Sequence, residues 1–212
     1  MRGILIDHLV HTGDDLGLVM TGKSLPAPTL QKEIVEIPGR NGALDMSEAL
    51  TGEPTYNNRP LTFTFLGNGS RETVLELIDN LLFYHGQYIT ITVDDLEEWY
   101  YEGRAEISYV DHYHYVEFEL LVDAQPFRQA LTGKKYTYSA VTNKAIVLEN
   151  TGVRTLPTVT VTADATIKIG NNLYTISAGT YDDEKLLLSH GNNSWIVTTT
   201  GTITITYREA KI

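Results

Sequence analysis

The sequence predicts a mainly β protein with one α-helix, divided into two domains at residues 1–128 and 129–212. Three observations support this interpretation. Apolar and polar residues alternate along many short segments, one segment alone has apolar residues at helical spacing, and the charge balance changes near Arg128. A chain of 212 residues can form one large domain or two small ones, so a division near Arg128 is physically reasonable.

The strands are predicted from period-two alternation. Val116, Phe118, Leu120 and Val122 recur at every second position of 113–122, which places them on one face of a strand. Threonine occupies the alternate positions of 61–65 and 89–93, and it suits the solvated face of a sheet. After residue 130 the predicted strands are 134–139, 145–149, 157–162, 166–169, 173–176, 185–188, 195–197 and 202–208, with turns at 170–172 and 191–193. This rhythm predicts a small β-sandwich.

One amphipathic helix is predicted at about residues 70–85. Ser70 can cap its first turn, Glu72 lies in that turn, and Gly86 follows as a stop signal. Its apolar positions recur three and four residues apart: Val74, Leu77, Ile78, Leu81 and Leu82. We expect this apolar stripe to cover one face of a sheet.

The charge of the chain is unevenly distributed. Residues 1–130 contain 8 basic and 21 acidic residues, a net charge of −13, whereas residues 131–212 contain 8 basic and 6 acidic residues, a net charge of +2. An acidic half argues against affinity for nucleic acid, since phosphate binding requires clustered Lys and Arg. The acids either form an ordinary solvated surface or serve to repel a polyanion.

The chain contains no cysteine, which excludes disulfides, thiolate metal sites and cysteine nucleophiles. The first eight residues lack the apolar stretch of a signal peptide, and no segment reaches the length of about 18 apolar residues that a membrane helix needs. We therefore expect synthesis in the cytoplasm and no contact with a membrane.

Residues 17–24 match the pattern of a phosphate-binding loop, G-x-x-x-x-G-K-[ST]. That loop requires a strand before it and a helix after it, so that backbone N–H groups face the phosphates. Pro26 and Pro28 oppose a helix at this point, and the chain shows no parallel α/β pattern. The match is therefore interpreted as accidental.

The other candidate sites also lack the residues that metal binding or catalysis requires. His112 and His114 are predicted on one strand face and could bind zinc as a pair, but no carboxylate at metal spacing accompanies them. The acids at 94, 95, 97 and 98 are typical of a solvated hairpin tip, and no G-x-S-x-G nucleophile motif occurs. The sequence predicts no catalytic, cofactor or metal site.

The most distinctive stretch runs from Glu36 to Pro60. Asn41-Gly42 is a strong turn signal, and some 20 residues before Leu61 have little core-forming pattern. Loops of this length are uncommon and tend to be functional. The stretch either folds against its own domain or forms an arm that becomes ordered against a neighbouring subunit.

These residues resemble the distal tail proteins of long-tailed bacteriophages that infect Gram-positive bacteria. The resemblance rests on Pro38-Gly39-Arg40-Asn41-Gly42-x-Leu44-Asp45, on Tyr56-x-Asn58-Arg59-Pro60 leading into an alternating strand, and on the helix that follows. Ile4-Leu5-Ile6-Asp7 and the segment 201–208 are similar to the first and last strands of that family. The likeness therefore extends over nearly the whole chain.

The resemblance implies a phage or prophage structural protein of the tail tip or baseplate, without catalysis or cofactor. Its N-terminal domain, β-sandwich-like with an arm or hairpin, would form a ring of identical subunits, usually six. Its C-terminal domain would be a galectin-like β-sandwich outside the ring. The ring would connect the tail tube protein to the tip proteins and let DNA pass without binding it specifically. The protein would be assembled in the host cytoplasm and located in the virion.

The resemblance also suggests which residues set the subunit geometry. They are Arg40, Asn41, Gly42, Asp45, Tyr56, Asn58 and Arg59. Asn41-Gly42 would make a turn, and Arg40 and Arg59 would donate charge-assisted hydrogen bonds to acidic neighbours. The acids of the N-terminal half would line the channel and repel DNA phosphates over a Debye length of ~8–10 Å.

Two alternatives remain open at this point. The protein could bind carbohydrate through the C-terminal sandwich, with Trp195, Tyr174 or Tyr181 stacking on sugar rings at a host surface. It could also be an enzyme that uses the 17–24 loop or a pair of carboxylates. About 80 residues after the boundary are too few for the additional carbohydrate-binding module that some distal tail proteins carry.

Overall fold

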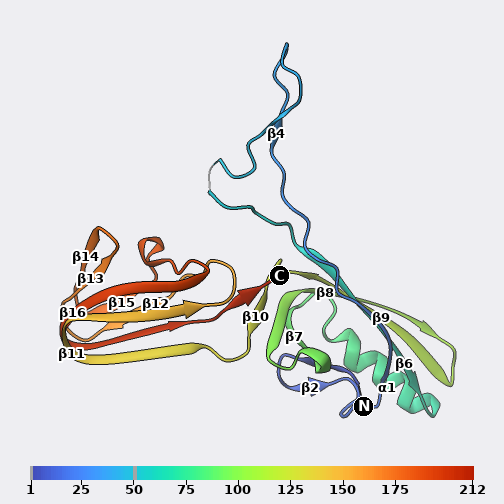
Figure 1. Cartoon of the computed structure of the whole chain (residues 1–212). Coiled ribbons are helices and arrows are strands. Elements are labelled where there is room, and N and C mark those ends of the chain that lie inside the picture. Colours follow the sequence, from blue (N-terminus) through green and yellow to red (C-terminus); the bar gives the residue numbers. More distant parts are fainter. Residues whose placement is uncertain (1, 50–51) are drawn as a thin grey trace. The chain divides into compact units, whose positions relative to one another are not determined.

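The computed structural model describes residues 2–49 and 52–212 and divides into two compact units (Figure 1). Unit 1 comprises the chain up to Arg128, and unit 2 comprises Gln129–Lys211. Strands dominate both units, and α1 (Arg71–Leu82) is the single α-helix of the described residues. The predicted fold class, mainly β with one helix, is confirmed.

Unit 1 is built around an antiparallel sheet with the strand order β2-β1-β7-β8-β9-β6-β3. The strands are β1 (Ile4–Ile6), β2 (Val10–His11), β3 (Val19–Ser24), β6 (Arg59–Asn68), β7 (Tyr88–Val93), β8 (Trp99–Asp111) and β9 (Tyr115–Ala124), with a 3-10 turn η1 (Asp94–Leu96) between β7 and β8. Long antiparallel strands allow one face of the sheet to be buried and the other solvated.

Helix α1 covers one face of this sheet, against β6, β8 and β9 (Figure 1). The hydroxyl of Ser70 accepts a hydrogen bond from the Thr73 backbone N–H at 3.2 Å, which caps the helix as predicted. The buried positions of α1 are Val74, Leu77, Ile78 and Leu81. They pack against alternate residues of β6 and β9. The apolar stripe of the helix and the apolar faces of the strands therefore form one core.

An arm leaves the sheet between β3 and β6. It contains the short antiparallel pair β4 (Ile34–Val35) and β5 (Leu44–Asp45), in which Ile34 faces Asp45 and Val35 faces Leu44. Figure 1 shows these two chains extending beyond the sheet of unit 1 as a hairpin.

Unit 2 consists of short strands arranged around two long ones. Its strands are β10 (Arg128–Ala130), which begins at the boundary, β11 (Lys134–Asn150), β12 (Thr158–Val161), β13 (Ala165–Ile169), β14 (Asn172–Ile176), β15 (Gly179–Tyr181), β16 (Gly191–Tyr207) and β17 (Ala210–Lys211), with a 3-10 turn η2 (Glu184–Leu186). Strand β16 pairs with β11 along its length, with β13 through its first half and with β12 through its second half. The sheet thus encloses a second core.

Several predicted boundaries in unit 2 are wrong. Segments 134–139 and 145–149 belong to one strand, β11, because shifts in register after Ser139 and Val141 absorb the polar residues between them. Segments 195–197 and 202–208 are both part of β16, and the predicted turn at 191–193 forms its first residues. The amide of Asn193 donates to the Ser189 carbonyl at 2.9 Å, so this asparagine serves a neighbouring loop. Segment 185–188 is not a strand: its first two residues belong to η2, and Leu188 forms an isolated bridge with Thr155.

Gly103 of β8 packs closely against the backbone of β9, opposite Ala124. A Cβ atom added to Gly103 would lie 2.6 Å from the Cα of Ala124, whose other neighbour in the sheet is Arg59. We expect Gly103→Ala to lower the free energy of unfolding of unit 1 by about 1–3 kcal/mol, because the strands must separate. Denaturant titration followed by intrinsic fluorescence measures this loss. Gly133→Ala, where the nearest atom would be 3.4 Å away, serves as the control, and equal losses in both variants would contradict the prediction.

Candidate assembly site: the arm, its root and the adjoining sheet face

The arm has no core of its own. None of the described residues between Thr29 and Asn58 is buried, although the segment carries many apolar side chains. Leu30, Ile34, Val35, Ile37 and Met46 are each between 40% and 56% exposed. Val35 and Leu44 lie opposite each other on one face of the hairpin, and Ile34 lies opposite Asp45 on the other face. A hairpin with exposed apolar side chains is typical of a surface that another protein covers.

The tip of the arm contains the first group of predicted site residues. Gly39 and Gly42 have φ values of +83° and +80°, a conformation that favours glycine. The hydrogen-bonded turn lies at Ile37–Arg40, where the Arg40 N–H donates to the Ile37 carbonyl at 3.1 Å. Asn41-Gly42 therefore forms a bend beside that turn, within a connection longer than the tight turn that the sequence indicates. The side chain of Arg40 is exposed.

Asp45 is held in a local contact with Ser47. Its carboxylate accepts hydrogen bonds from the Ser47 hydroxyl at 2.5 Å and from the Ser47 backbone N–H at 3.0 Å. These two bonds lower the pKa of Asp45 below its ordinary value. The hydroxyl of Ser47 also accepts from the Glu33 N–H at 2.8 Å, so Asp45 helps to join the two chains of the hairpin.

The root of the arm contains the second group, and here the side chains are used within unit 1. Tyr56 meets the ring of Phe127 edge-on, with the centroids 5.5 Å apart, and its backbone bridges to Leu30. The Asn58 amide donates to the Asp123 carboxylate at 3.2 Å. The predicted set is therefore divided: residues 40–45 lie at the exposed tip, and residues 56–59 fasten the root to the sheet.

Arg59 lies beneath the root and is only 3% exposed. Its guanidinium carbon is 4.6 Å from the centroid of the Tyr101 ring, and its Nη1 donates to the Pro26 carbonyl at 3.4 Å. Burial lowers the pKa of Arg59 below its usual value, and the positive charge of Arg128 acts in the same direction, while Tyr101 opposes them. The sequence suggested that Arg59 contacts an acidic neighbour. In this subunit the Arg59 side chain is instead buried, and no acidic side chain is bonded to it among the described residues.

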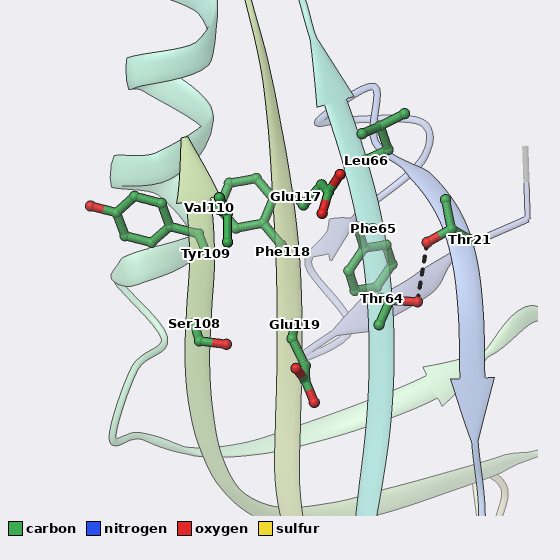
Figure 2. Close-up of a pocket in the computed structure, with 10 residues that line it drawn as sticks. All are labelled: Thr21, Thr64, Phe65, Leu66, Ser108, Tyr109, Val110, Glu117, Phe118 and Glu119. Atoms are coloured by element: carbon green, nitrogen blue, oxygen red, sulfur yellow. Dashed lines mark hydrogen bonds between the residues drawn. The ribbon is translucent and has the colours of Figure 1, made fainter. Parts of the chain in front are cut away.

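The face of the sheet opposite α1 forms a shallow hollow of about 600 Å³ (Figure 2). Its walls come from β3, β6, β8 and β9. Thr64, Leu66, Val110, Glu117 and Glu119 point from this face, and the Thr21 hydroxyl donates to the Thr64 hydroxyl at 3.1 Å. Apolar and acidic side chains are thus mixed on an open surface.

The carboxylates of unit 1 are not confined to one surface. On the face opposite α1, strand alternation places Glu106, Glu117, Glu119 and Asp123 beside a single cation, Arg104. Other acids lie on α1, on the arm and around η1. Only some of the acidic residues in the first 130 positions therefore gather on one face of the sheet.

The chain is similar to known proteins in structure. No family model and no curated protein match the chain. Among solved structures, the Dit (gp 19.1) protein of phage SPP1 superposes with a TM-score of 0.66, covering 98% of this chain and 99% of that one at 16% identity. The chain has the fold of SPP1 Dit. A chain of the phage p2 baseplate in its activated conformation also matches, with a TM-score of 0.41 and 7% identity over 97% of both chains.

The Dit fold confirms the resemblance to phage distal tail proteins that the arm and strand motifs indicate. The likeness includes both units, because almost the full length of each chain is aligned. SPP1 Dit is described as a paradigm of the hub adsorption apparatus of phages that infect Gram-positive bacteria.

Of the three expected sugar-stacking residues, Trp195 cannot have that role. Trp195 is 1% exposed and lies in the core of unit 2, so its ring cannot stack on a sugar. Tyr174 and Tyr181 are half-buried against the same core, and the Tyr181 hydroxyl donates to the Ser177 carbonyl at 2.9 Å. Trp195 lies on the inner face of β16.

The remaining motifs also have structural explanations. The loop-like match at 17–24 largely forms strand β3, and Lys23 pairs with Asp95. His112 and His114 lie in the turn between β8 and β9, so the prediction that they share a strand face is wrong; the ring of His112 stacks on Tyr115 at 4.2 Å. Across residues 2–49 and 52–212, no group of three His, Asp or Glu side chains could hold a metal ion. The same residues contain no helix of the length and apolarity that crossing a bilayer requires.

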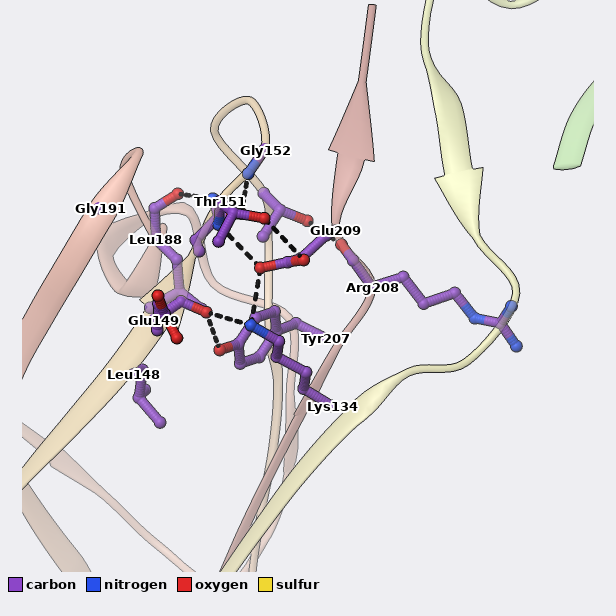
Figure 3. A network of polar contacts seen from close by, with 12 residues as sticks. Lys134, Leu148, Glu149, Thr151, Gly152, Leu188, Gly191, Tyr207, Arg208 and Glu209 are labelled. Carbon is purple, nitrogen blue, oxygen red and sulfur yellow. Dashed lines mark hydrogen bonds and ion pairs between the residues drawn. The ribbon is translucent and has the colours of Figure 1, made fainter. Parts of the chain in front are cut away.

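A polar cluster in unit 2 joins the two ends of β11 to the end of β16 (Figure 3). Lys134 Nζ lies 2.7 Å from Glu209 and 2.9 Å from the Glu149 carbonyl, which also accepts from the Tyr207 hydroxyl at 2.6 Å. Glu209 further accepts from the Thr151 N–H and hydroxyl. Burial acts to raise the pKa of Glu209, but the bonds from Lys134 and Thr151 outweigh it and lower the pKa.

The low pKa of Glu209 predicts an acid-sensitive contribution to the stability of unit 2. This contribution is complete above the unfolded-state pKa of about 4.3 and is lost as the pH falls through the lower folded-state pKa. We expect Glu209→Gln to reduce the free energy of unfolding at pH 7 by about 1.5–3 kcal/mol and to flatten its dependence on pH below about 4.5. Thermal unfolding between pH 2 and pH 7 measures both effects, and Glu184→Gln on exposed η2 is the control.

Proposed function

We propose that this chain is a non-catalytic structural subunit of a phage tail tip, in which unit 1 forms a ring with identical copies. The observation that carries the proposal is the Dit fold over 98% of the chain together with an arm that no part of its own unit buries. The ring, six-membered by analogy, would join the tail tube to the tip proteins in the virion. Unit 2 would be a galectin-like sandwich carried outside it.

The energetics of the arm support assembly. Ordering one residue costs roughly 1–2 kcal/mol of backbone entropy, which folding normally offsets by burying apolar surface. The arm has only exposed apolar side chains for this purpose, so a neighbouring copy that covers Val35, Leu44 and Met46 would provide the missing burial. Arg40 and Lys32 are the only cations between residues 25 and 58, and they would meet an acidic neighbour favourably.

The carboxylates opposite α1 support the placement of this face toward a DNA channel. Glu106, Glu117, Glu119 and Asp123 would present fixed negative charge to passing phosphates and prevent adhesion. The acids on α1 and on the arm would lie elsewhere, so the channel would be lined by a subset of the acidic residues. The exposed Thr and Ser side chains between them would keep the wall polar.

The arm predicts a specific change in oligomeric state. We expect the double substitution Val35→Ser and Met46→Ser to convert a ring-sized species to monomer, because it removes apolar surface that only assembly would bury. The midpoint of thermal unfolding of the monomer should be unchanged. Size-exclusion chromatography with light scattering over a range of concentrations measures the mass.

The matched control is Val147→Ser with Leu173→Ser, which removes comparable exposed apolar surface from unit 2. This control should leave the ring intact. A wild-type protein that stays monomeric at every concentration would refute the assembly proposal. A ring that survives the arm substitutions would refute the role of the arm.

The channel lining predicts an induced affinity for DNA. In assembled protein we expect Glu117→Lys with Glu119→Lys to retain single- and double-stranded DNA in a salt-sensitive manner, because four charges of difference per subunit would face the channel. The control is Glu72→Lys with Glu76→Lys, which makes the same change of charge on α1. Fluorescence anisotropy at several salt concentrations measures binding. Equal binding by both double variants would show that the face opposite α1 has no special access to DNA.

A further inference from the structure

The root of the arm contains two arginines that lack a carboxylate partner among the described residues. Arg59 is almost fully buried on the Tyr101 ring, and Arg128 lies half-buried with its guanidinium carbon 5.2 Å from the centroid of Trp99. Nε and Nη2 of Arg59 and Nε of Arg128 are buried without any hydrogen-bond acceptor. In a chain with a net charge of −11, this is an unusual concentration of unpaired positive charge.

The unpartnered atoms of Arg59 lie on the edge of the guanidinium that can bind a carboxylate. Nε and Nη2 form one edge of the guanidinium, and two parallel N–H groups on that edge match the two oxygens of a carboxylate. Nη1 is directed to the Pro26 carbonyl, and the flat face is occupied by Tyr101. Only the edge suited to bidentate recognition of an anion is left free.

A buried charge without a partner is strongly destabilising, and this cost is removed when a counter-charge arrives with good geometry. Stacking on Tyr101 and Trp99 compensates only the faces of the two guanidinium groups. The cover over Arg59 includes Pro26, whose carbonyl accepts at 3.4 Å, a long hydrogen bond. The Pro26 carbonyl lies at Nη1 and so leaves the Nε–Nη2 edge without an acceptor.

We infer that Arg59 and Arg128 form a carboxylate-binding site at the root of the arm, whose donor atoms are buried in the free subunit. The carboxylate would come either from the arm of a second copy, where Glu33 and Glu36 are exposed, or from a small free carboxylate. In both cases the ligand would accept from the Nε–Nη2 edge of Arg59 while Arg128 supplies the second positive charge. This site is independent of the exposed apolar face of the arm.

The first experiment uses acetate as the probe and chloride at matched ionic strength as the reference. We expect acetate to raise the midpoint of thermal unfolding of the wild-type protein by about 3–5 °C at a concentration ten times its Kd. Arg59→Lys keeps the charge but lacks the paired N–H groups, so it should lose this response. Arg128→Lys, at a less buried position, should reduce it and serves as the second variant should Arg59→Lys fail to fold. Arg104→Lys, which changes an exposed arginine, should respond as the wild type does.

The second experiment distinguishes the two sources. When the arm supplies the carboxylate, Glu33→Gln with Glu36→Gln weakens self-association at least tenfold relative to Glu48→Gln, and acetate competes with association. When the ligand is a free carboxylate, both arm variants associate as the wild type does and keep the acetate response. Absence of an acetate response in the wild-type monomer, or an equal response in Arg59→Lys, overturns the proposal.

Discussion

Strand β6 is anchored in the core of unit 1 by Leu61, Phe63 and Phe65, and the arm begins where that anchoring ends. Arg59, the first residue of β6, is the point of transition: its backbone pairs with Ala124, and its side chain donates to Pro26 on the chain that leaves β3 for the arm. The geometry of the arm therefore depends on how firmly α1 holds one face of the sheet. A loose core beneath α1 would leave the arm without a fixed direction.

The same packing gives the sheet two chemically different faces. Burial of one face under α1 forces the alternate residues of β6, β8 and β9 outward, where Thr, Ser and Glu predominate. A subunit with one acid-rich sheet face and one exposed arm has two separate surfaces on which contacts can be made. In the proposed ring a channel and a neighbour would therefore not compete for the same residues.

The sequence predicted features that depend on local periodicity. The helix cap at Ser70, the apolar stripe of α1 and the alternation of β9 were all correct, because each is decided within a few residues. The long irregular segment was also predictable, since residues 36–60 lack a core-forming pattern, but only the family resemblance favoured an arm. The partners of Arg59 were not, because Tyr101, Ala124 and Arg128 approach it only through the register of three strands.

Long-range pairing explains the other errors in the same way. A polar interruption such as Thr142–Lys144 looks like a turn in a single sequence, yet β11 continues through it because β16 supplies partners on both sides of the bulge. His112 and His114 follow the alternation of a strand, but the reversal between β8 and β9 occurs at their position. Trp195 could not be assigned to an inner or outer face without knowing which strands flank it.

Strands β11 and β16 have a further consequence for the evolution of the molecule. Lys134 lies directly opposite Tyr207, so the chain enters and leaves unit 2 at one point, fastened there by Glu209. A folded module that is connected through two adjacent strands can be exchanged for another with similarly spaced ends, leaving the remainder of the polypeptide undisturbed. In the proposed ring, unit 2 could therefore be replaced by another module while unit 1 keeps its contacts with neighbouring copies.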